Sequence, residues 1–275
     1  MKKSILSPAL LLLTVLVVIL SVWGPETLAR YTDRGILNQI QTQEEETGGE
    51  GYRYQLSSHE KLYILSQCLN AQSQPETEQS ARIRNLDTSY QDLTGTYAFV
   101  VNHNGPSGKE ITDEEIYGTA NDGIQILKEN GILPEDIKEI QASAYEATLY
   151  SAIDVPEPRN NVAVWKLSLT GSLQNANKEN RLIDAYVDAD DGKIYEFYVR
   201  AQLKWEDIDP DALIEQWSSY MGLSAPEAYE TDNPLLETTP YYKKYVFSGN
   251  GDDERTIVTV GFYEGINELF LKISR

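Results

Sequence analysis

The most constraining feature of this sequence is a run of alternating apolar and polar residues that a short acidic turn interrupts. Residues 185–200 read AYVDADDGKIYEFYVR, and apolar side chains recur at every second position on both sides of the Asp-Asp-Gly. A period of two is typical of a β-strand with one buried face. Asp-Gly favours a tight turn in which glycine takes a positive φ. The stretch therefore predicts a β-hairpin with strands over 182–189 and 193–200.

The acids of this turn superficially resemble the start of a calcium-binding loop, which has the pattern D-x-D-x-x-G. Asp188 and Asp190 fit its first two acids, but Gly192 comes one residue early. Val199 stands where the loop needs a glutamate that binds calcium through both oxygens. We therefore interpret the acids as turn residues and expect no metal site.

Elsewhere, helix signals precede groups of alternating segments. Ser57 with Glu60, and Thr112 with Glu115, have the spacing of a capping box, and Asp209-Pro210 is a typical helix start. Alternating segments that predict strands occupy 96–103, 142–153, 162–170, 182–189, 193–200, 241–249, 254–263 and 267–274. A helix followed by a meander occurs twice, so the pattern predicts an α+β fold of two units, each a helix packed on an antiparallel β-meander.

We place the boundary between these units near residue 205. The first unit covers 56–205 with its N-terminal helix, and the second, shorter one covers 206–275. In the first unit, Trp165 shares a strand face with Ala163, Leu167 and Leu169. The preceding helix offers a matching apolar stripe of Ile116, Ala120, Ile124 and Leu127. We therefore expect Trp165 to lie under this helix, in the core.

The first 29 residues indicate where the chain is located. Lys2 and Lys3 precede Ile5–Trp23, an uncharged and almost wholly apolar run that as a helix spans about 28 Å, close to the thickness of a bilayer. The lysines favour a cytoplasmic start, so a single transmembrane helix would leave residues 30–275 outside, behind a polar linker over 30–55. The alternative is a cleavable signal peptide ending at Thr27-Leu28-Ala29, which would make the chain a secreted protein.

Composition excludes several function classes. The formal charge is −20, from 43 acids and 23 bases, which repels nucleic acid. Cys68 is the only cysteine, and His59 and His103 are the only histidines, so we expect no disulfide, no metal site and no cofactor. The sequence has no G-x-S-x-G, Walker-type or G-x-G-x-x-G motif, so we name no catalytic residue.

Acidic clusters leave one enzymatic alternative open, a surface hydrolase that uses carboxylates on glycans or peptides. Three of these clusters stand at predicted helix starts, where acids favour the helix dipole without doing chemistry. The clusters are Asp113/Glu114/Glu115, Glu135/Asp136 and Glu206/Asp207/Asp209.

A family resemblance rests on the strand VAVWKLSL and the hairpin LIDAYVDADDGKIYEFYV. With the helix before them, these segments resemble the PepSY domain family over roughly residues 110–201. The resemblance implies a regulatory or accessory module outside the bacterial membrane, acting on proteases or membrane sensors and carrying no catalytic residues. A small-molecule sensing domain, with a pocket between helix and sheet, is a further alternative.

Tyrosine is unusually frequent, with 18 in the chain. Alternation places Tyr186, Tyr198 and Tyr242 on the strand faces opposite the predicted core. Tyrosine suits half-buried sheet surfaces in general, but it is also enriched where proteins touch one another. These three tyrosines are therefore the candidate protein-contact surface, and the expected partner is another membrane or envelope protein.

Overall fold

The computed structural model describes residues 53–73, 96–108, 110–171, 173, 179–229, 241–249 and 254–274. All of them belong to one unit of the chain, Gly48–Arg275. The predicted membrane span Ile5–Trp23, the cleavage site at residues 27–29 and the linker up to residue 52 lie outside the described residues. Among the helices that are described, none is both long enough and apolar enough to cross a membrane.

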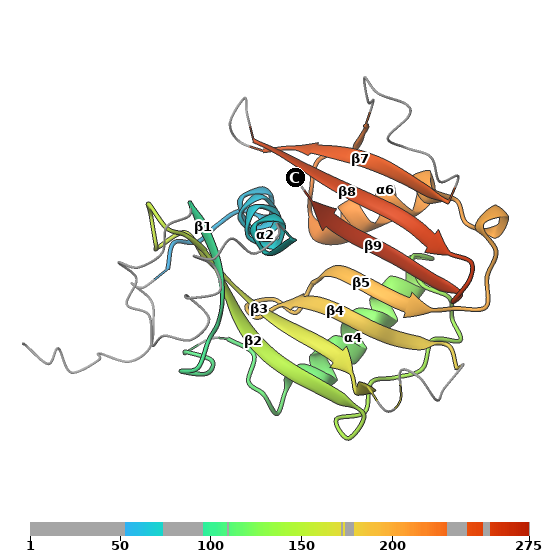
Figure 1. Cartoon of the computed structure of the whole chain (residues 1–275), viewed down its shortest axis with the longest axis horizontal. Coiled ribbons are helices and arrows are strands. Elements are labelled where there is room, and N and C mark those ends of the chain that lie inside the picture. The colour runs from blue at the N-terminus through green and yellow to red at the C-terminus, as the bar shows by residue number, and fades with distance from the viewer. Residues whose placement is uncertain are drawn as a thin grey trace, which may run out of the picture. The chain divides into compact units, whose positions relative to one another are not determined.

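The described strands form a single antiparallel sheet (Figure 1). In chain order they are β1 Tyr97–Val101, β2 Tyr145–Asp154, β3 Asn161–Leu169, β4 Arg181–Asp188, β5 Ile194–Arg200, β6 Glu227–Ala228, β7 Tyr242–Ser248, β8 Arg255–Tyr263 and β9 Glu268–Ser274. Their order across the sheet is β1-β2-β3-β4-β5-β9-β8-β7-β6. The two predicted meanders are thus neighbours in one sheet, joined where β5 meets β9.

The predicted fold class, two helix-on-meander units, is therefore wrong. Residues Phe197 to Arg200 of β5 pair with Leu271 to Glu268 of β9, so the two meanders share hydrogen bonds. A free strand edge leaves main-chain donors and acceptors unpaired, and pairing two such edges satisfies both. This long-range pairing merges the meanders into one nine-stranded sheet in the described chain.

Three α-helices of the described chain pack on this sheet: α2 Ser58–Ser73, α4 Ile116–Glu129 and α6 Pro210–Met221. Ser57 and Glu60 form the capping box predicted before α2, with the Ser57 N–H donating to Glu60 Oε2 at 2.7 Å. The side chain of Asp209 accepts from two backbone N–H groups at the start of α6, and Gly222 ends that helix with φ 72°. The helix signals at Ser57 and Asp209 are confirmed, whereas Thr112 and Glu115 form their capping box one turn before α4, which begins at Ile116.

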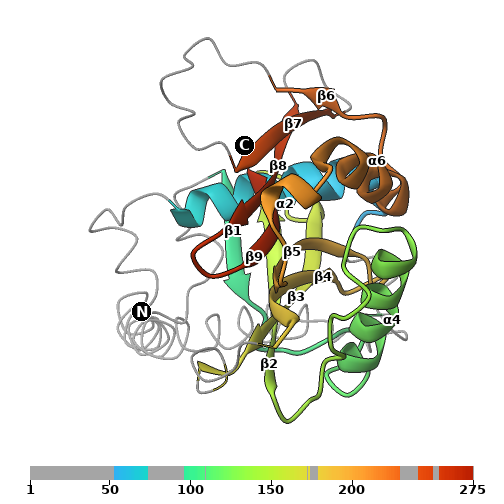
Figure 2. The ribbon, with the colours of Figure 1, turned by 90° about the vertical axis from the view of Figure 1, so that its right-hand side faces the viewer.

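The helices divide the sheet into a covered face and an open face. Figures 1 and 2 show α4 and α6 on the same side of the strands. The helix α2 instead lies between the two arms of the sheet, where it contacts β1, β2 and β3 on one side and β8 and β9 on the other. We call the side that carries α4 and α6 the covered face, and the opposite side the open face.

The core lies between the covered face and the helices α4 and α6, and it includes the buried side of α2 with Leu62, Leu65 and Cys68. Trp165 is 4% exposed, and its indole N–H donates to the carbonyl oxygen of Ile111, just before α4, at 2.9 Å. The apolar stripe of α4, from Ile116 to Leu127, is buried. In the second half of the sheet, the ring of Trp217 in α6 meets Phe247 of β7 edge-on. The prediction that Trp165 is a core residue is confirmed.

Candidate functional site

The open face carries a row of aromatic residues across its middle. Strand register places Tyr198 of β5 opposite Phe270 of β9, Phe270 opposite Gly261 of β8, and Gly261 opposite Tyr242 of β7. The rings of Tyr198 and Phe270 stack with centroids 5.8 Å apart, and those of Phe270 and Tyr263 with centroids 4.7 Å apart. This row, Tyr198, Phe270, Tyr263 and Tyr242 around Gly261, is the aromatic row of the open face.

Gly261 is what allows the Phe270 ring to lie flat in this row. A Cβ at position 261 would overlap the ring of Phe270, so only glycine leaves room for the ring over the β8 backbone. Phe270 is therefore buried at 6% exposure although it lies on the open face, while its neighbour Tyr263 is 51% exposed. The sheet thus presents a fixed aromatic surface with an exposed ring beside a buried one.

A second aromatic group on the open face surrounds Tyr186 of β4. The ring of Phe99 stacks on Tyr150 with centroids 4.7 Å apart and meets Tyr186 edge-on at 5.8 Å. The ammonium group of Lys166 lies over the Tyr186 ring, 5.8 Å from its centroid. Burial raises the pKa of the Tyr186 hydroxyl above its ordinary value. Tyr186 is therefore a half-buried neutral ring that carries a cation on its face.

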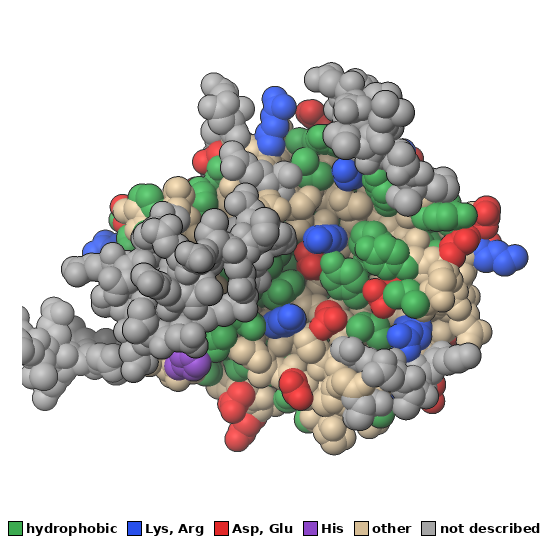
Figure 3. All heavy atoms as spheres, in the orientation of Figure 1, with side chains coloured by type: hydrophobic (Ala, Val, Ile, Leu, Met, Phe, Trp, Pro, Cys, Tyr) green, Lys and Arg blue, Asp and Glu red, His purple; other side chains and the backbone are tan. Residues whose placement is uncertain are grey.

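Tyr242 shares this combination of ring and cation. The ammonium group of Lys244 lies 5.4 Å from the ring centroids of both Tyr242 and Tyr229. The structure thus places all three predicted tyrosines, Tyr186, Tyr198 and Tyr242, on one face of one sheet. Figure 3 shows the middle of this face, where hydrophobic side chains alternate with basic and acidic ones.

Between Tyr186 and Tyr198 lies a buried carboxylate that the sequence analysis did not single out. Glu196 of β5 stands opposite Tyr186 and is 5% exposed. One oxygen of its carboxylate accepts the backbone N–H of Ile273 at 2.9 Å, and the carboxylate also hydrogen-bonds the Tyr198 hydroxyl. Burial raises the pKa of Glu196 to about 7, although these two hydrogen bonds and the charges of Lys272 and Lys166 oppose the shift.

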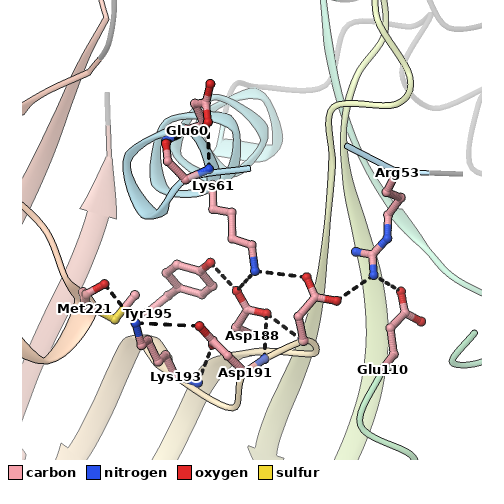
Figure 4. A network of polar contacts seen from close by, with 11 residues as sticks. Arg53, Glu60, Lys61, Glu110, Asp188, Asp191, Lys193, Tyr195 and Met221 are labelled. Carbon is pink, nitrogen blue, oxygen red and sulfur yellow. Dashed lines mark hydrogen bonds and ion pairs between the residues drawn. The ribbon is translucent and has the colours of Figure 1, made fainter. Parts of the chain in front are cut away.

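The acidic turn has a different environment (Figure 4). Gly192 has the predicted positive φ, 75°, and Asp188 is buried with its Oδ1 accepting the Asp190 N–H at 2.7 Å. The other carboxylate oxygen accepts from the Lys61 ammonium at 2.8 Å and from the Tyr195 hydroxyl at 2.5 Å. Asp188 therefore ties α2 to the β4–β5 turn.

Arg53 extends this cluster to the segment before α4. Its guanidinium contacts Asp190 at 2.7 Å and Glu110 at 2.6 Å. Burial opposes ionisation of Asp190, but Lys61 and then Arg53 outweigh it and lower the pKa of that carboxyl. Lys61 and Arg53 thus pair with the carboxylates of the turn that resembles a calcium loop. The described ranges contain no group of three or more His, Cys, Asp or Glu side chains arranged to hold a metal.

The other acidic clusters have structural roles where the structure shows their contacts. Glu115 accepts from the N–H and hydroxyl of Thr112 in a capping box before α4. Asp209 caps α6, and Asp207 accepts the N–H of Lys204 at a short 3₁₀ turn. These are the helix-start contacts that the sequence predicts for these carboxylates.

A polar cavity of about 410 Å³ lies away from the open face, beside the start of β4. It is lined by Lys138, Glu139, Gln141, Ala144, Tyr145, Glu179 and Arg181. The cations Lys138 and Arg181 both pair with Glu179, so the charges of its wall are largely matched internally.

Comparison with known proteins adds no relative to this picture. No family model, no curated protein and no solved structure matches the chain.

Proposed function

We propose that this chain is a non-enzymatic binding module outside the bacterial membrane, and that its open face docks another membrane or envelope protein. By this contact it regulates a membrane sensor, a protease or an envelope process. The N-terminal apolar segment holds it at the membrane, and the PepSY-like hairpin is part of the docking sheet. The partner, in this proposal, offers apolar groups to the aromatic row and carboxylates to the lysines beside it.

The single observation that carries the proposal is the aromatic row with its fixed ring packing. Tyr198, Phe270 and Tyr263 stack in sequence, and Gly261 makes room for the central ring. Aromatic rings with a polar edge are enriched in protein contacts because they bury a large area at a small loss of side-chain entropy. Because the buried ring of Phe270 holds the exposed ring of Tyr263 in place, Tyr263 would lose little side-chain entropy when a partner binds.

Charge supports the choice of partner. The chain carries −20 overall, yet the open face has Lys166 and Lys244 over tyrosine rings and Lys272 on β9. At physiological salt the distant acids are screened over about 8 Å, so a docking protein senses mainly these nearby lysines. A partner surface with carboxylates opposite the lysines fits this arrangement, and nucleic acid does not fit the charge of the whole chain.

The test is site-specific photo-cross-linking of the full chain in its native cells. A photoreactive amino acid replaces Tyr263 on the open face, and in a matched control it replaces Ile126 on α4, which is 44% exposed. We expect a discrete cross-linked protein from position 263 and none from position 126. The same products from both positions, or none from position 263, would contradict the docking face.

A further inference from the structure

Beside the aromatic row, between Tyr198 and Tyr186, lies one ionisable group whose surroundings are unusual for a carboxylate. Glu196 is buried, and the hydrogen bonds to its carboxylate come from the Ile273 N–H and the Tyr198 hydroxyl. Within the described ranges, neither Lys166 nor Lys272 is within ion-pair distance of it, so they act on it only through space. Buried carboxylates are usually paired, because isolated negative charge is poorly solvated there.

Glu196 also occupies a special place in the strand pairing. The β5–β9 pairs run from Arg200 with Glu268 to Phe197 with Leu271 and stop one residue before Glu196. Beyond that point the Ile273 N–H bonds to the Glu196 side chain instead of to the β5 backbone. The carboxylate is therefore held at the seam between the two halves of the sheet, in the middle of the open face.

The charged groups around Glu196 nearly balance while it is ionised. On the strands β3, β4, β5 and β9, the open face presents three cations, Lys166, Arg200 and Lys272, and three carboxylates, Asp184, Glu196 and Glu268, beside pairs whose charges are already matched. Arg181 of β4, opposite Arg200, is one of these, since it is paired with Glu179. Asp184 accepts the Ser168 hydroxyl, and Glu268 lies in the field of Arg200. Asp188, further along β4, is bound to Lys61 and Tyr195. Protonation of Glu196 alone would leave this patch with one net positive charge.

We infer that Glu196 is a proton-controlled switch of the docking face: its protonated form favours an acidic segment of a partner protein, and its ionised form disfavours it. This inference rests on the proposed function. Two physical effects act in the same direction. Loss of the Glu196 charge removes repulsion of the partner's carboxylates, and a partner that covers the face removes water that the ionised form needs.

Both effects couple docking of the partner to protonation of Glu196. Docking raises the proton affinity of Glu196, so a falling pH tightens docking by the same factor. Burial already raises the pKa of Glu196 to about 7 in the free chain, so the change would fall within the pH range met outside a cell. One unit charge about 12 Å from a bound carboxylate changes affinity by about tenfold at an effective dielectric constant near 20.

The first half of the test measures the switch without a partner. Full-length chain labelled with carboxyl-¹³C glutamate is titrated from pH 4 to 9 in detergent, and the Glu196 signal is identified by its loss in Glu196→Gln. We expect that signal to titrate near pH 7, together with the amide shift of Ile273. Titration of the Glu196 signal at pH 4–5 would overturn the inference and leave the docking proposal intact.

The second half measures the docking face with a named probe. The probe is a fluorescein-labelled peptide of four Glu-Tyr repeats, and a four-repeat Lys-Tyr peptide is its charge control. We expect the acidic peptide to bind the parent about tenfold more tightly at pH 6 than at pH 8. Glu196→Gln should bind it at both pH values as the parent does at pH 6. Glu146→Gln, which removes an exposed acid on β2, should keep the parent's pH dependence.

The outcomes separate the two proposals. If Glu196→Gln binds the acidic peptide with the same pH dependence as the parent, the switch is overturned and the docking proposal stands. Absence of acidic-peptide binding at every pH, with Glu196 titrating near 7, would overturn the acidic partner and with it both proposals.

Discussion

The ring of Phe270 lies directly over Gly261, its cross-strand partner on the open face. A Cβ at position 261 would occupy the space of the ring, so Gly261→Ala should push Phe270 off the sheet and out of its stacks with Tyr198 and Tyr263. We predict a loss of about 1 kcal/mol in the free energy of unfolding, the size of such ring contacts. Urea denaturation measures it. Gly265→Ala is the control, because a Cβ there meets open space, and an equal loss in both variants would show that the ring packing is not responsible.

Asp188 should be the most sensitive acid of the β4–β5 turn. Asp188→Ala removes the acceptor of the fully buried Tyr195 hydroxyl and leaves the Lys61 ammonium with Asp190 alone, which costs about 3–5 kcal/mol. Asp191→Ala changes an acid with an exposed side chain, which accepts the Lys193 N–H at 3.1 Å and lies 3.7 Å from the Lys193 ammonium, so it should cost less than about 1 kcal/mol. Thermal unfolding followed by circular dichroism compares the two. Similar losses would mean that the network of Figure 4 contributes little to the fold.

Glu196 should make the stability of the chain fall as pH rises. Burial raises its pKa from 4.5 to about 7 in the folded chain, so its favourable contribution is complete below about pH 4.5 and is lost as pH rises through 7. The difference corresponds to about 3 kcal/mol. Urea midpoints at pH 5 and 8 should therefore differ more in the parent than in Glu196→Gln, whose amide oxygen can still accept the Ile273 N–H. The same pH dependence in both proteins would assign it to other groups.

Trp165 should be the side chain on which the α4 half of the sheet most depends. It is almost completely buried, and its indole N–H is bonded to Ile111. Trp165→Ala should cost about 3–5 kcal/mol through lost burial and the cavity that remains. Trp205→Ala, at a partly buried site outside the sheet, should cost clearly less. A denaturant midpoint measures both, and an unshifted midpoint for Trp165→Ala would mean that this residue does not hold α4 on the sheet.

Local signals predicted the elements of this fold well because each depends on neighbouring residues. The capping residues Ser57 and Asp209 and the positive φ of Gly192 follow from short-range chemistry that the sequence states directly. The joining of the meanders could not be predicted in this way. It depends on Phe197 pairing with Leu271, and neither residue's local pattern specifies a partner so distant in the chain.

The candidate site was partly predictable for the same reason. Alternation alone puts Tyr186, Tyr198 and Tyr242 on one kind of face, but not next to one another. Alternation also indicates that Phe270 points away from Leu269 and Leu271, a signal that was present and was not used. Glu196 gave no such signal, since its burial arises from the seam with β9, and Lys61 reaches Asp188 across 127 positions of sequence.

The docking face can be tested most directly by hydroxyl-radical footprinting of the full chain in its native membranes and after purification. Tyr263 on the open face and Tyr54 before α2 are almost equally exposed, at 51% and 49%, and have the same side chain. We predict that oxidation of Tyr263 is several-fold slower in the native membranes than in the purified chain, while oxidation of Tyr54 is unchanged. Equal oxidation of Tyr263 in both preparations would show that nothing covers the open face and would contradict the account.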